Sequence, residues 1–139
     1  MQAQNFKNHA RFVPLFHVLT FGICLAILVL SSILFFREMN METTLYLLIA
    51  IVLLLSFYFI RLFPLKAQDR AIRAEENLRY FTLAGKLFDN KVSMSQIIAL
   101  RFADDSELIS LTERALKENM SSKEIKMAIK NWRADHYRA

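Results

Sequence analysis

Glycine, proline, cysteine and histidine are scarce in this chain of 139 residues, and most of these shortages exclude a class of site. Two glycines cannot build the glycine-rich loop that cradles phosphate groups. The single cysteine, Cys24, allows neither a disulfide within the chain nor a thiolate metal site. The three histidines, His9, His17 and His136, are too scattered to suggest a metal centre. The sequence therefore predicts no catalytic residue, no metal site, no cofactor and no enzyme activity.

Charged residues are almost absent from two long stretches. Residues 14–36 contain no Lys, Arg, Asp or Glu, and residues 44–63 contain only Arg61, close to their end. A bilayer core is about 30 Å thick and a helix rises about 1.5 Å per residue, so each stretch is long enough to cross. The short connector between them predicts a two-helix transmembrane hairpin. No small-residue cleavage pattern follows the first stretch, which favours an uncleaved anchor over a signal peptide.

Basic residues lie before the first apolar stretch and at or after the end of the second, and few lie between the two stretches. They are Lys7, Arg11, Arg61, Lys66, Arg70 and Arg73, whereas the connector carries one, Arg37. Basic residues next to membrane helices stay on the cytoplasmic side. The pattern predicts a multi-pass membrane protein with both termini in the cytoplasm.

The composition changes after residue 64. Residues 65–139 hold 14 Lys or Arg and 11 Asp or Glu, close to an ordinary soluble surface, and show no strand alternation. We expect an all-α protein: residues 1–64 form an N-terminal segment and the membrane hairpin, and residues 65–139 form a small cytoplasmic helical domain. A domain of about 75 residues is only marginally stabilised by its own core, which predicts support from a partner, a second copy or the membrane.

A helix is predicted from residue 65 to about residue 84, continuing the second membrane helix. Small and apolar residues repeat along it at spacings of four and three, which is typical of a coiled-coil seam. These are Ala67, Ala71, Ala74, Leu78 and Phe81. Two interpretations stay open: the seam packs against later helices of the same chain, or it joins two chains. Glu75 and Arg79 are spaced for an ion pair on the solvated side.

Three shorter helices are predicted from their start signals. Gly85 ends the long helix, and capping residues begin the next ones at Ser93, Asp104 and Ser121. The last helix is expected to extend as far as Trp132, because apolar residues continue at helical spacing.

A basic stripe follows the last predicted helix at spacings of three, four and three. It consists of Lys123, Lys126, Lys130 and Arg133. It fits an ordinary solvated face, contact with the anionic cytoplasmic leaflet, or binding of a nucleic acid or an acidic protein. The net charge of +5 is compatible with each of these interpretations.

Four segments, residues 4–12, 68–79, 96–102 and 128–136, resemble a family of small bacterial membrane proteins. This is the domain-of-unknown-function group 6526, which is associated mainly with Bacteroidota. The resemblance implies a bacterial inner membrane and a small helical cytoplasmic domain. It implies no activity and no catalytic residue.

These observations predict a membrane-anchored, non-enzymatic interaction or scaffold protein of unknown pathway. Its expected partners are the lipid bilayer, a protein partner or a second copy, and anionic lipid. The alternative is a membrane-tethered nucleic-acid-binding module. The third hypothesis is a small transporter accessory or an enzyme. Loss of turnover on mutation of His17, Glu75 or Asp135 would support it.

Overall fold

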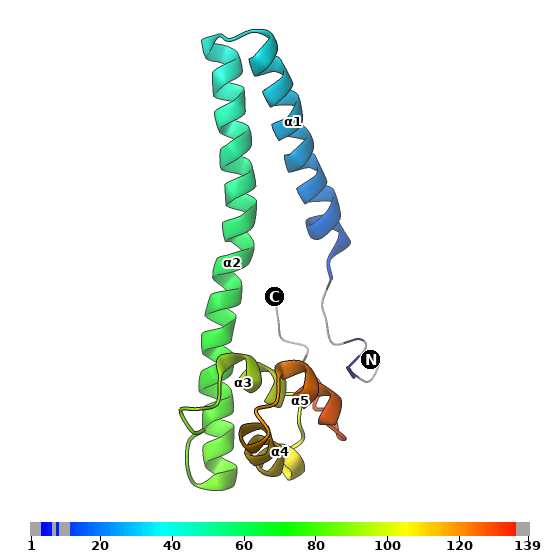
Figure 1. Cartoon of the computed structure of the whole chain (residues 1–139), viewed down its shortest axis with the longest axis vertical. Helices are drawn as coiled ribbons and strands as arrows, with labels where there is room; N and C mark the ends of the chain where they lie inside the picture. The colour runs from blue at the N-terminus through cyan, green and yellow to red at the C-terminus, as the bar shows by residue number, and fades with distance from the viewer. Residues whose placement is uncertain (1–3, 7, 9–11, 136–139) are drawn as a thin grey trace. The chain divides into compact units, whose positions relative to one another are not determined.

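A computed structural model describes residues 4–6, 8 and 12–135 of the chain. The described residues form helices and no strand, which confirms the all-α prediction. The elements are η1 (Leu15–Thr20), α1 (Phe21–Arg37), α2 (Met41–Ala84), α3 (Met94–Leu100), α4 (Asp105–Lys117) and α5 (Ser122–Ala128) (Figure 1). The chain divides into two compact units, an apolar unit of Arg11–Pro64 and a helical unit of Met1–Ala10 with Leu65–Ala139.

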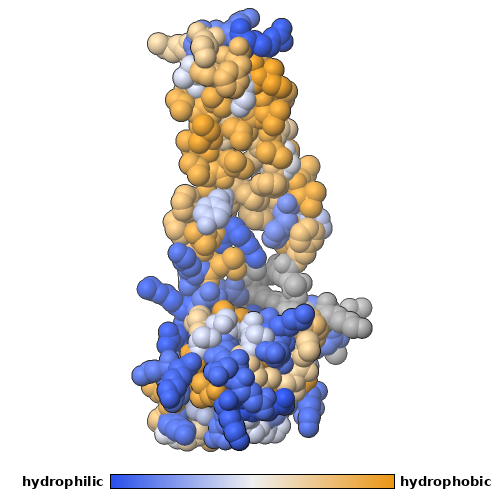
Figure 2. Space-filling view, viewed as in Figure 1, coloured by the Kyte–Doolittle hydropathy of each residue, from blue (hydrophilic) through white to orange (hydrophobic). Residues whose placement is uncertain are grey.

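The apolar unit contains the two apolar stretches, in which Arg61 is the one charged residue. The helical segments Leu15–Arg37 and Met41–Ala84 are both long and apolar enough to cross a membrane. Only 11% and 6% of their most apolar windows are buried, unlike the core helix of a soluble protein. Figure 2 shows hydrophobic residues covering this part of the chain. Within the unit, the ring of Phe57 on α2 lies 4.7 Å from the ring of Phe16.

The first helical turns differ from the expected α-helix. Residues Leu15–Thr20 form a π-helix that follows Pro14 and leads into α1. The Thr20 hydroxyl donates to the carbonyl of Leu15, five residues earlier, at 3.0 Å. This side-chain bond spans the same five residues as the backbone bonds that define a π-helix.

Several polar groups in the apolar unit are hydrogen-bonded within the chain. The connector between α1 and α2 is only residues 38–40, and the Asn40 side chain accepts a hydrogen bond from the Thr43 backbone at 2.9 Å. The Ser32 hydroxyl donates to the carbonyl of Leu28 at 2.7 Å. A hydrocarbon environment offers no solvent partner, so such internal bonds are what a membrane helix requires.

The helical unit has one continuous apolar core. Its most deeply buried large side chains are Ile97, Leu100, Phe102, Leu108 and Ile125. The long helix ends at Ala84, and Gly85 follows with φ of +70°, a conformation that favours glycine.

All three predicted caps are confirmed. The Ser93 and Ser121 side chains each accept from the backbone N–H three residues on, and Asp104 accepts from the backbone of Ser106. The Ser106 hydroxyl and N–H lower the pKa of Asp104, and the Ser121 hydroxyl and N–H lower the pKa of Glu124. Because the folded pKa values are depressed, these carboxylates stabilise the fold above their ordinary pKa, and the contribution is lost as the pH falls through the folded values.

The last helix is shorter than predicted. α5 ends at Ala128, and Ile129 is extended with φ −65° and ψ 124°. The Glu107 carboxylate accepts hydrogen bonds from the backbone N–H groups of Lys130 at 3.2 Å and Asn131 at 3.0 Å. These backbone groups are therefore bonded to α4, and the prediction of a helix as far as Trp132 is wrong.

The segment after α5 packs on the core in extended form. Trp132 forms an isolated antiparallel bridge with Ala103, and its ring lies 5.1 Å from the ring of Phe102. The backbone N–H of Arg133 donates to the carbonyl of Phe102 at 2.8 Å. Because the chain has a single tryptophan, the fluorescence of Trp132 reports on this core alone.

We expect Leu108→Ala to destabilise the helical unit by about 3 kcal/mol, because the side chain is fully buried and its removal leaves a cavity. The measurement is urea unfolding of the full-length protein in mild detergent, followed by Trp132 fluorescence. The matched control is Leu87→Ala, since Leu87 is 60% exposed and should change little. Equal midpoints for the two variants would contradict this description of the core.

Candidate functional site

One face of α2 within the helical unit is packed. Ile72, Glu76 and Tyr80 are 7%, 7% and 3% exposed, and Ile72 and Tyr80 belong to the core. The Tyr80 ring stacks on Phe88 at 4.3 Å. Burial raises the pKa of the Tyr80 phenol, and the charge of Glu113 raises it further. This face therefore joins α2 to the rest of the unit.

The other face of the same helix carries the predicted seam, and it is exposed. Its members are Ala67, Ala71, Ala74, Leu78 and Phe81, which we call the α2 seam. Leu78 is 64% exposed and Phe81 is 50% exposed. With 3.6 residues per turn, these positions lie on the side of the helix opposite Ile72 and Glu76. Packing of the seam against this chain's own later helices is therefore wrong for the described residues.

Arg79 connects α2 to the end of the α3–α4 segment and to the first residue of α4. Its guanidinium donates to Glu76 at 3.0 Å, to Asp105 at 2.6 Å and to the carbonyl of Ala103 at 2.6 Å. The side chains of Arg79 and Glu76 are about 10% and 9% exposed. The predicted Glu75–Arg79 pair is wrong in its partner, because Arg79 points to the packed side where Glu76 lies.

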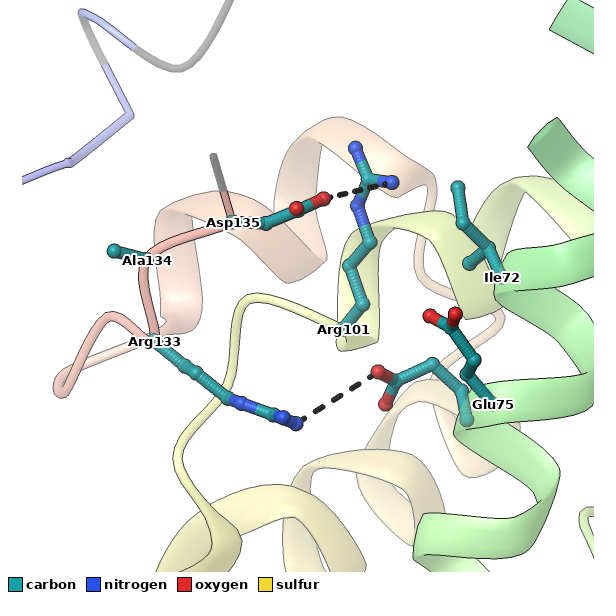
Figure 3. A pocket seen from close by; sticks show the side chains of 7 residues that line it. Ile72, Glu75, Arg101, Arg133, Ala134 and Asp135 are labelled. Atoms are coloured by element: carbon teal, nitrogen blue, oxygen red, sulfur yellow. Dashed lines mark ion pairs between the residues drawn. The ribbon is translucent and has the colours of Figure 1, made fainter. Parts of the chain in front are cut away.

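A polar pocket of about 420 Å³ lies beside this cluster, where α2, the end of α3 and the C-terminal segment meet (Figure 3). Arg101 pairs with Asp135 at 3.1 Å, and Arg133 lies 3.8 Å from Glu76. Glu75 lines the same pocket from α2. Each of the two arginines that line the pocket lies next to an acidic group, and the Arg133–Glu76 contact ties the C-terminal segment to α2.

The structure does not bring the predicted basic stripe together on one helix. Lys123 and Lys126 lie on α5, and the Lys126 ammonium is 5.8 Å from the centre of the Phe102 ring. Lys130 and Arg133 lie beyond the helix end, and Arg133 faces Glu76. The prediction that these four basic residues form one face of a single helix is therefore wrong, because α5 ends before Lys130 and Arg133.

The structure also shows the surroundings of two other reactive side chains, His17 and Cys24. The His17 Nδ1 lies 2.9 Å from the carbonyl of Val13, and Cys24 is a buried free thiol. Within the described residues, no group of three or more His, Cys, Asp or Glu side chains could hold a metal ion.

The structural roles of two residues were not predicted from the sequence. Glu107 holds the backbone after α5, and Arg101 pairs with Asp135 across 34 positions. Helical spacing signals only contacts three or four residues apart, so it could have found Glu76–Arg79 but neither of these.

We expect Arg79→Ala to lower the free energy of unfolding of the helical unit by about 3 kcal/mol, because it leaves the buried Glu76 carboxylate without this partner. Arg79→Lys should lose less, since the ammonium keeps the charge but cannot reach three acceptors at once. Unfolding of the full-length protein in mild detergent, read by Trp132 fluorescence, measures both. Arg73→Ala removes an exposed arginine of the same helix and serves as the control. A loss no larger than that of the control would contradict the role given to Arg79.

Comparison with known proteins identifies the family of this chain. No curated protein and no solved structure matches the chain. The model of the Family of unknown function (DUF6526) matches residues 1–139, the whole length of the chain. This confirms the resemblance found in the sequence. The chain belongs to the Family of unknown function (DUF6526).

Proposed function

We propose that this protein is a membrane-anchored, non-enzymatic interaction module. The two apolar helices cross a bacterial inner membrane as a hairpin, and both termini and the helical unit are in the cytoplasm. The α2 seam is the surface that binds a protein partner. Basic residues just beyond the second span, such as Lys66, contact anionic lipid headgroups.

The exposed α2 seam is the observation that carries the proposal. A solvated helix face normally carries polar residues, whereas this one has three alanines followed by Leu78 and Phe81, both at least half exposed. Continuous apolar surface of this kind is typical of an interaction site. The opposite face is already occupied by the core, so the seam is free for a partner outside the chain.

The lipid-facing part of the proposal has separate support. Large apolar side chains such as Leu30, Ile60 and Phe63 are about 60% exposed or more. Exposing so many of them to water would be costly, at about 25 cal/mol for each Å². A hydrocarbon solvent removes that cost.

The nucleic-acid alternative has weaker support. Binding to phosphates depends on several basic side chains that lie along one surface. Here two of the four candidates leave the helix, and Arg133 faces an acidic residue. A small transporter accessory or an enzyme has less support still, because the carboxylate of Asp135 is paired with Arg101.

Cysteine labelling tests the membrane topology. In a Cys24→Ala background, we expect Asn40→Cys in the connector to react with a membrane-impermeant maleimide in intact spheroplasts. Leu87→Cys, in the exposed loop after α2, should react only after lysis. The ratio of labelling before and after lysis should differ by about tenfold between the two variants, because basic flanks hold the helical unit inside. Labelling of Leu87→Cys in intact spheroplasts would reverse the orientation.

Purification in mild detergent tests the interaction surface. We expect the full-length protein to be recovered at a mass above its 16.3 kDa monomer, with a partner or a second copy bound. Leu78→Ser should reduce the bound fraction several-fold, because truncation of a central apolar contact commonly costs over about 1 kcal/mol. Leu87→Ser changes an equally exposed leucine outside the seam and should have no effect. A lone monomer for the unchanged protein would contradict the proposal.

A further inference from the structure

We propose that a second copy of this chain covers the α2 seam, as a parallel two-stranded coiled coil in which Arg70 pairs with the partner's Glu75. This inference rests on the proposed function, because it needs α2 to continue from a membrane span into the cytoplasm. It adds the identity of the partner, the direction of the two helices and their register.

The spacing of the α2 seam fits a coiled coil. Assigning Ala71 and Leu78 to heptad position a places Ala67, Ala74 and Phe81 at position d, without a break. Alanine in the first half lets two helix backbones approach closely, and the larger side chains fill the second half. All five residues are exposed, so the surface exists without any rearrangement of the unit.

The charges that flank the seam determine the register. In the same heptad, Arg70 takes position g and Glu75 takes the following position e. In a parallel pair, residue g of one helix meets the next e residue of the other, so two Arg70–Glu75 pairs form, related by symmetry. The other such pair along the seam, Asn77 with Thr82, is polar and uncharged. Both Arg70 and Glu75 are exposed, and in the described part of the chain neither belongs to an ion pair.

The fold permits this arrangement. Because Ile72, Glu76 and Tyr80 attach α2 to its own unit on the opposite face, a second helix can reach the seam without displacing the core. If both copies are anchored in one membrane in the same orientation, their α2 helices run in the same direction. The membrane therefore excludes an antiparallel pair.

Charge exchange in the full-length protein tests the register. In a Cys24→Ala background with Ala74→Cys as the reporter, a seam position where cysteine is close in size to the native residue, mild oxidation of native membranes should give a disulfide-linked dimer. Arg70→Glu or Glu75→Arg alone replaces two attractions by two repulsions and should lower the dimer yield by roughly fivefold. The double exchange, Arg70→Glu with Glu75→Arg, restores opposite charges across the seam and should recover the yield. Rescue by the double exchange is the result that the proposal requires.

Controls separate this inference from the proposed function. Arg73→Cys lies outside the seam and should give little dimer, and Trp132 fluorescence shows whether each variant is folded. Equal dimer yields at positions 73 and 74, or failure of the double exchange in folded protein, would overturn the homodimer. If Ala74→Cys gives no dimer while Leu78→Ser releases a different bound protein, the homodimer is wrong and the proposed function stands. If neither a dimer nor a bound partner is found, both are wrong.

Discussion

The attachment of α2 to its own unit through Ile72, Glu76 and Tyr80 is the constraint on which the rest of the structure depends. A helix has a fixed angular spacing, so burying these three residues decides which others stay exposed. The seam, with Leu78 and Phe81, is exposed because the packed face lies on the other side. The same choice directs Arg79 toward Glu76 and Asp105, and away from Glu75.

Two different solvents fit the two parts of α2. Up to Pro64 the exposed surface of α2 is largely apolar, and the hydroxyl groups of Thr43 and Thr44 donate to backbone carbonyls of the connector. From Leu65 onward, α2 carries charged residues and packs one face against the core of the helical unit. The 44-residue helix α2 contributes its first part to the apolar unit and its second part to the helical unit. In our proposal, the first part anchors the chain in the bilayer and the second part carries the interaction surface.

The polar pocket beside α2 has a structural role, because its ion pairs connect segments of the helical unit that are distant in the sequence. Its acidic and basic side chains come from α2, from the residue after α3 and from the C-terminal segment. Arg101 with Asp135, and Arg133 with Glu76, connect segments that the sequence separates by 34 and 57 positions. Such contacts hold the extended segment after α5 in place and leave the seam as the stronger candidate for binding.

The sequence by itself determined the all-α fold, the two apolar helices, the caps at Ser93, Asp104 and Ser121, and the seam, because each is a local pattern of spacing or composition. Only the tertiary structure decided that the seam is exposed and that α5 ends at Ala128. Both depend on contacts between distant residues: Glu107 bonds the backbone of Lys130 and Asn131, and the core chooses one face of α2. The periodicity of a sequence cannot decide which of two faces of a helix is buried, because that depends on the elements that pack against the helix.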